Sequence, residues 1–124
     1  MTRNKNASKT KIDYDVNVYV REEYNADTKE SHWNQDQWYL HVYRYTDNWA
    51  GDKFEVSAPY LLTKEESFAM NFVETGDIDD GLDGWMDMDY LMKNYWSQMS
   101  DRIREYLEGF PKYAEDVRTQ MVYN

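Results

Sequence analysis

The chain has no cysteine among its 124 residues. Disulfides, thiolate nucleophiles and cysteine-based zinc sites are therefore excluded, and a reducing cytoplasm is the natural compartment. Long apolar runs are also missing. No stretch approaches the ~20 residues that cross a bilayer, and the polar N-terminus lacks the apolar core of a signal peptide. We expect a cytoplasmic protein without a membrane segment.

Catalytic motifs are equally scarce. The sequence has no Gly-x-Ser-x-Gly turn for a serine nucleophile and no glycine-rich loop suited to phosphate. We expect His32 in a loop and His41 on a strand face, both without a catalytic role. Acidic pairs suited to glycoside hydrolysis can be drawn almost anywhere among 24 Asp and Glu residues, so they carry no specificity. We predict a protein that is not an enzyme and needs no cofactor.

Basic residues are absent between Lys64 and Lys93, a stretch that we call the acidic segment. Like charges a few ångströms apart repel by about 1 kcal/mol in water, and here no Lys or Arg dilutes them. A metal ion or a partner with a basic surface would relieve this repulsion. The segment carries nine acidic residues, namely Glu65, Glu66, Glu74, Asp77, Asp79, Asp80, Asp83, Asp87 and Asp89.

The net charge of −10 is unevenly distributed. Residues 1–11 hold four basic residues and no acid, so residues 12–124 carry 10 basic against 24 acidic residues, a net −14. Phosphates would be repelled by such a body, and we expect no direct binding of nucleic acid by it. A basic protein is the more suitable partner. Residues 1–11 are predicted to form a disordered basic tail, and residues 12–124 a single domain.

Three strands are predicted before residue 60. Apolar and polar residues alternate strictly over 12–20, and a second alternating run covers 37–45. Residues 54–58 indicate a short third strand, and residues 24–35 a polar connection. The second strand would place Trp38, Leu40 and Val42 on its covered face.

Three helices are predicted after these strands. Thr63 and Glu66 form a capping box for a helix over 64–75 that buries Phe68 and Phe72. Three- and four-residue steps over 87–110, through Trp96 and Ile103, indicate one long helix, and a last short helix starts at Pro111. The expected fold is α+β, a three-stranded antiparallel sheet followed by three helices packed on one face.

The other face of the predicted sheet is rich in aromatic residues. It can be a second contact surface, including a homodimer interface, because interface cores favour Tyr. It can equally be a solvent-facing sheet stabilised by cross-strand aromatic pairs. The residues on this face are Tyr19, Tyr39, His41, Tyr43 and Tyr45.

A calcium loop is one interpretation of the acidic segment. Starting at Asp79, it would place Asp83 and Asp87 at ligand positions 5 and 9. Position 3 is Gly81, however, and position 12, which needs a bidentate glutamate, is Tyr90. We therefore expect no metal site, and a calcium-stabilised binding module stays a third alternative.

Helix stabilisation is the second interpretation. Asp87 and Asp89 lie near the start of the predicted long helix and would each stabilise its N-terminus by roughly 0.3–1 kcal/mol. This accounts for two of the nine acids and leaves seven without a role.

Mimicry of DNA is the third interpretation. Duplex DNA presents one negative charge per about 1.7 Å of axis, and closely spaced carboxylates can occupy a cleft that binds DNA. Glycines would let the segment lie irregularly, while its large apolar residues would anchor it or dock into the partner. These apolar residues are Ile78, Leu82, Trp85 and Met86.

A family resemblance points the same way. The run Phe72-Val73-Glu74-Thr75-Gly76-Asp77-Ile78-Asp79-Asp80 resembles an acidic stretch of phage-encoded anti-CRISPR inhibitors of type II nucleases. Small size, absence of cysteine and acidic charge are also similar to that group, whereas the basic tail and the tyrosine-rich sheet differ. The resemblance implies a CRISPR nuclease with its guide RNA as partner. The protein would block the basic surface that reads the protospacer-adjacent motif, and thereby target DNA binding.

The predicted partner-binding residues combine two sources. The resemblance implies the four acids of residues 74–80, and charge spacing adds three acids and the apolar anchor Trp85. An inhibitor of a restriction enzyme or another DNA-processing enzyme, and an immunity protein against a basic toxin, remain alternatives with the same surface. The full set is Glu74, Asp77, Asp79, Asp80, Asp83, Trp85, Asp87 and Asp89.

Overall fold

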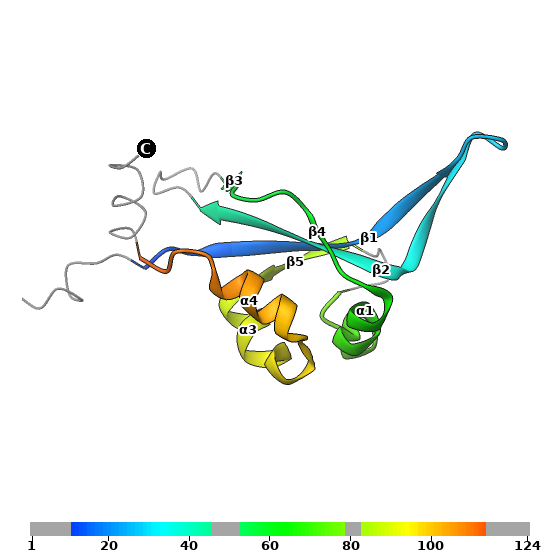
Figure 1. The fold of residues 1–124 in the computed structure, drawn as a ribbon. Coiled ribbons are helices and arrows are strands. Elements are labelled where there is room, and N and C mark those ends of the chain that lie inside the picture. The colour runs from blue at the N-terminus through cyan, green and yellow to red at the C-terminus, as the bar shows by residue number, and fades with distance from the viewer. Residues whose placement is uncertain (1–10, 46–52, 79–82, 114–124) are drawn as a thin grey trace, which may run out of the picture.

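The computed structural model describes residues 11–45, 53–78 and 83–113, without the side chains of residues 32–36. This part of the chain forms a five-stranded antiparallel sheet in the order β3-β2-β1-β5, with β4 also pairing with β2. The helices α1, α3 and α4 lie on one side of this sheet (Figure 1). The predicted α+β class with an antiparallel sheet is confirmed, whereas the prediction of three strands is wrong.

The strands and helices have the following bounds in chain order. They are β1 (Tyr14–Asn25), β2 (Glu30–Tyr45), β3 (Lys53–Glu55), β4 (Tyr60–Leu61), α1 (Lys64–Met70), α2 (Phe72–Thr75), β5 (Asp83–Asp87), α3 (Met88–Tyr95), the 3₁₀ turn η2 (Trp96–Gln98) and α4 (Asp101–Glu108).

The hairpin of β1 and β2 is longer than the sequence predicts. Much of the predicted polar connection over 24–35 belongs to the paired strands β1 and β2, whose last pair is Asn25 opposite Glu30. The Asn25 side chain accepts hydrogen bonds from the amides of Asp27 and Thr28, and Lys29 closes the turn at φ 58°. The end of this hairpin extends beyond the helices (Figure 1). With no helix against it, this part of the ladder lacks the apolar alternation that marks a strand.

The predicted covered face of the sheet is confirmed. The apolar residues of β1 and β2 that alternate toward the helices are at most 7% exposed. They meet residues of α3 and α4, and this contact forms the core. The core includes Tyr14, Val16, Val18, Val20, Trp38, Leu40, Val42, Leu91, Tyr95, Met99, Ile103 and Leu107.

The predicted long helix over 87–110 is interrupted. α3 ends at Tyr95, and Met99 is extended after the turn of η2. Ser100 then caps a new helix, accepting a hydrogen bond from the Ile103 amide at 3.2 Å. Met99 and Ile103 still enter the core, so the apolar period continues across the break and hides it. The serine followed by Asp101 in the first turn is the capping signal that the sequence offered.

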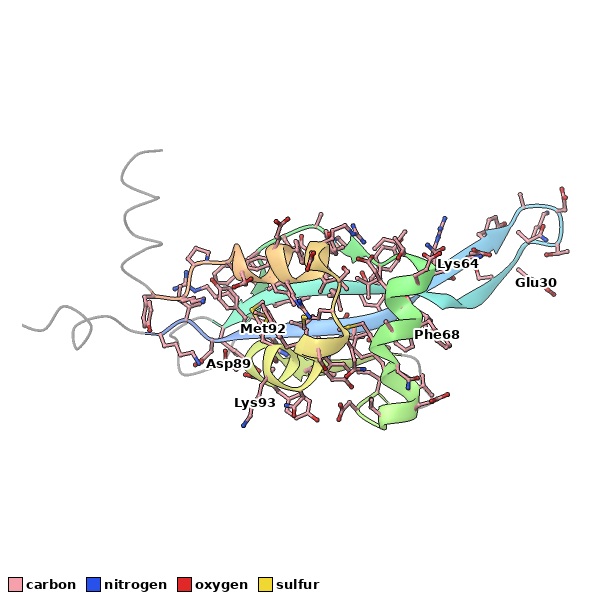
Figure 2. All side chains as sticks on the ribbon, turned by 60° about the horizontal axis from the view of Figure 1, so that its bottom comes forward. Glu30, Lys64, Phe68, Asp89, Met92 and Lys93 are labelled. Atoms are coloured by element: carbon pink, nitrogen blue, oxygen red, sulfur yellow. The ribbon has the colours of Figure 1, made fainter. Side chains whose placement is uncertain are left out.

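The first predicted helix is also interrupted. The Thr63 capping box is present, but Asn71 at φ 58° ends α1, and α2 is a separate turn. Phe72 is buried as predicted, whereas Phe68 is 86% exposed (Figure 2). The left-handed residue between them changes the helix direction, so the two phenylalanines do not share a face. Trp96, part of the apolar pattern of the predicted long helix, is 38% exposed and lies against the Arg104 guanidinium.

The ends of the described chain meet. Lys11, which the sequence places in the tail, forms an isolated bridge with Tyr113, and Lys112 accepts a hydrogen bond from the Ile12 amide. The predicted third strand over 54–58 corresponds to the shorter β3. The predicted last helix falls largely on residues 114–124 and the tail on residues 1–10, outside the described residues.

Candidate binding site on the acidic edge strand

Part of the acidic segment is a strand, which the sequence did not predict. β5 pairs antiparallel with β1, with Asp87 opposite Asp15 and Asp83 opposite Tyr19. Within the described residues it stands at the end of the strand order, so it is an edge strand. Charged residues are common on edge strands because they discourage pairing with another chain. This role accounts for part of the acidity without any partner.

Gly84 lets this strand pack against the helix layer. A Cβ atom built on Gly84 would lie 3.0 Å from Cδ1 of Ile78, which is itself 1% exposed. Met86, two residues on, is 6% exposed. Gly84, Met86 and Ile78 therefore anchor the segment to the core, as the sequence suggested for two of them.

The remaining residues of β5 lie on the opposite side, which we call the open face. Successive strand residues alternate between faces, so Asp83, Trp85 and Asp87 share the side that no described helix covers. Trp85 is 48% exposed, and both aspartates are exposed. Asp83 accepts a hydrogen bond from the Asn17 side chain at 2.7 Å. These three residues are the part of the predicted site that the fold brings together.

Asp87 and Asp89 have roles in the fold. The Asp87 carboxylate accepts hydrogen bonds from the amides of Asp89 at 2.9 Å and Tyr90 at 3.3 Å, and so caps α3. Asp89 forms an ion pair with Lys11. The hydrogen bond that Lys11 donates to Asp89 raises the pKa of Lys11, and the charges of Asp89, Asp13 and Asp87 add to the effect. Asp87 thus has the expected helix-capping role, and Asp89 lies in the first turn of α3.

Asp77 is tied to α3 and not to the open face. Its carboxylate accepts hydrogen bonds from the hydroxyls of Tyr90 at 2.8 Å and Tyr95 at 2.5 Å. Burial raises the pKa of Tyr95, and the hydrogen bond to Asp77 raises it further. Since Tyr95 is a buried core residue, Asp77 holds the end of α2 against α3.

The other predicted acids are dispersed. Glu74 is exposed on α2, where its carboxylate accepts a hydrogen bond from Asn71 at 3.1 Å. Asp79 and Asp80 lie outside the described residues. The described residues of the predicted set therefore divide into an open-face group on β5, a helix-side pair of Glu74 and Asp77 near α2, and Asp89 on α3.

Glu66 belongs to the acidic segment but is a core contact between α1 and α4. Its residue is 8% exposed, and its carboxylate accepts hydrogen bonds from Arg102 and Ser100. Burial alone would raise the pKa of Glu66. The hydrogen bonds from Arg102, Ser100 and the Thr63 amide outweigh burial and lower it to about 2. The capping box was visible in the sequence, whereas the pairing with Arg102 depends on tertiary structure.

A second cluster on the open face was only partly visible in the sequence. Asp15 is 8% exposed and accepts hydrogen bonds from the Tyr45 hydroxyl at 2.6 Å and from Lys53 Nζ at 3.2 Å. Lys53 Nζ also lies 3.7 Å from the ring centroid of Trp85. The Tyr43 ring lies 5.0 Å from that indole. The alternation of β1 marked Asp15 as facing this side, but not its partners.

Aromatic contacts continue across the open face. Tyr19 and Tyr39 stack at 5.2 Å, and His41 lies 4.6 Å from the Tyr43 ring. His41 lies on a strand, as predicted, and is only 8% exposed, with its Nε2 2.6 Å from the Glu55 carboxylate. Burial raises the pKa of Tyr19, and neighbouring tyrosines and Asp83 add to it. Cross-strand packing, one of the two expected roles, is therefore present.

Within the described residues, no group of three or more His, Asp or Glu side chains is placed to hold a metal ion. No helix in the same part of the chain is long and apolar enough to cross a membrane.

The chain was also compared with known proteins. Neither the family models, nor the curated proteins, nor the solved structures that were searched gave a match.

Proposed function

We propose that this protein is a non-catalytic inhibitor that binds the basic DNA-binding surface of a nuclease, with carboxylates in place of DNA phosphates. The observation that carries the proposal is the arrangement on β5, where Asp83 and Asp87 flank the half-exposed Trp85 on the open face. The aspartates supply charge, and the indole supplies the kind of aromatic anchor that is enriched at binding hot spots.

The spacing of these carboxylates suits such a role. Four residues of a strand span about 13 Å, which is close to four 3.4 Å steps along one strand of DNA. Asp15 and Glu55 lie on the same face, so acidic groups extend from β5 across to β3. Asp79 and Asp80 stand four and three residues before Asp83 in the sequence and would extend the charge along the chain.

The first enzyme to test is a type II CRISPR nuclease with its guide RNA, since the run 72–80 resembles anti-CRISPR inhibitors of such nucleases. On this proposal the protein acts in the cytoplasm of a bacterial host. Fewer residues of the run 72–80 are available for binding than the sequence suggested. Phe72 and Ile78 are buried, and Asp77 is held by two tyrosines. Restriction enzymes, other DNA-processing enzymes and basic toxins remain alternative partners of the same surface.

The test is a double substitution, Asp83→Asn with Asp87→Asn. Asn caps helices about as well as Asp, so this change removes two charges and keeps the cap of α3. Truncating one partner of a buried interfacial charge pair costs about 2–5 kcal/mol. We therefore expect the affinity for the nuclease to fall by roughly a hundredfold or more.

The matched control is Asp27→Asn with Glu30→Gln. It removes the same charge at the turn between β1 and β2, where Glu30 lies away from the helices (Figure 2). Binding and inhibition are measured with the inhibitor added before or after target DNA, at low and high salt. A DNA mimic should protect DNA only when added first, and should bind more weakly as salt rises. Equal potency in both orders, or equal losses in the two double variants, would contradict the proposal.

A further inference from the structure

We infer that the open face contains a binding site for a lysine side chain, formed by Asp15, Tyr45 and Trp85 and filled here by the chain's own Lys53. The three residues come from three different strands, β1, β2 and β5. Its ligand class is a primary ammonium on an alkyl stem. The inference rests on the proposed function only for the source of that lysine, which is the basic surface of the partner.

The geometry is that of an aromatic and acidic cage for a cation. Lys53 Nζ lies 3.7 Å from the Trp85 ring centroid and 5.4 Å from that of Tyr45, within the range of cation–π contacts. It also donates to the Asp15 carboxylate at 3.2 Å. Tyr45 donates its hydroxyl proton to the same oxygen, which leaves the carboxylate oriented toward the cation.

Asp15 and Tyr45, which form part of the cage, lie on longer and better-paired strands than Lys53, which occupies it. Asp15 lies on β1, which is paired on both sides, and Tyr45 lies on β2. Lys53 belongs to β3, a strand of three residues that are all exposed. Withdrawing Lys53 therefore disturbs little of the fold, and an incoming lysine ammonium can make the same contacts.

The charges around the cage favour a second cation. The hydrogen bond to Asp15 raises the pKa of Tyr45, and the negative charges of Asp15, Asp87 and Asp13 add to this effect. Lys53 pairs with Asp15, whereas the charges of Asp13 and Asp87 also raise the pKa of Lys11. A basic surface that approaches the Asp83–Asp87 strand would thus bring its lysines next to a site that already binds an ammonium group.

The test uses N-acetyl-lysine methylamide as the probe and the indole N–H signal of Trp85 in NMR spectra as the readout. The Lys53→Ala variant has an empty cage and should bind the probe at least tenfold more tightly than the native chain. Lys64→Ala, which removes an exposed lysine from α1, is the matched control and should behave like the native chain. Adding Trp85→Phe assigns the signal, and adding Asp15→Asn to Lys53→Ala should abolish binding.

The native chain supplies an independent measurement that does not depend on the variant folding. The Lys53 side-chain protons should be shifted upfield by the Trp85 ring, and saturating probe should return them toward free-lysine values. No probe binding to folded Lys53→Ala, binding that survives Asp15→Asn, or no upfield shift in the native chain would overturn the inference. Probe binding without nuclease inhibition would support the lysine-binding cage and reject the proposed function. Inhibition that depends on Asp83 without probe binding would support the proposed function and reject the cage.

Discussion

The two faces of the sheet bury side chains by different means. The covered face presents Val16, Val18 and Leu40 to the helices, each 0% exposed, and needs no polar partner there. The open face uses the alternate residues of the same strands, which are aromatic or charged and contact one another. Each carboxylate drawn into the fold is matched: Asp15 by Lys53 and Tyr45 on the open face, and Glu66 by Arg102 on the helix side. A pattern of buried apolar residues alone would describe only the covered face.

A large effect is expected when neighbouring residues of β2 that point to opposite faces are compared. Leu40→Ala removes a fully buried side chain from the core and should destabilise the fold by about 2–5 kcal/mol. Tyr39→Ala removes a half-buried ring that stacks on Tyr19, and should cost about 1–2 kcal/mol. Urea unfolding of both variants measures the difference. Equal losses would mean that the open face is part of the core.

An intermediate effect is expected from Glu66 as the pH changes. Its folded pKa of about 2 lies below the ordinary value of 4.5. The ionised carboxylate therefore stabilises the fold above about pH 4.5, and this contribution disappears as the pH falls toward 2. The difference in pKa corresponds to roughly 3 kcal/mol. Glu66→Gln should remove it while keeping an amide able to serve the capping box.

The measurement is urea unfolding between pH 7 and pH 2. The native chain should lose stability relative to Glu66→Gln across the acidic part of this range. Glu65→Gln, the exposed neighbour, is the control and should follow the native chain. Parallel pH profiles for the native chain and Glu66→Gln would show that the pair with Arg102 does not stabilise the fold.

The smallest effect is expected at Phe68, on the outer side of the helix layer. Since Phe68 is 86% exposed, Phe68→Ala should change the free energy of unfolding by less than about 0.5 kcal/mol. Phe72 is 1% exposed between the rings of Trp38 and Tyr95, so Phe72→Ala should cost about 3–5 kcal/mol. A large loss for Phe68→Ala would place this ring inside the fold and not on its surface.

Local patterns in the sequence determined several parts of this protein. The alternation over 12–20 and 37–45 identified the covered face, because strand residues two apart always share a side. Thr63 and Glu66 marked the start of α1, since a capping box depends on residues only three apart. The spacing of Asp83, Trp85 and Asp87 was also visible, although the sequence placed it in a loop.

Tertiary structure decided the rest. Asp83–Asp87 is too acidic to indicate a strand, and it becomes one because β1 offers an unpaired edge and Ile78 packs on Gly84. The break at Ser100 leaves the apolar period intact, so the hydrophobic pattern does not reveal it. Likewise, the acids of the segment differ in role because their partners lie far away in sequence. Arg102 binds Glu66, and Lys11 binds Asp89, through contacts that no local pattern records.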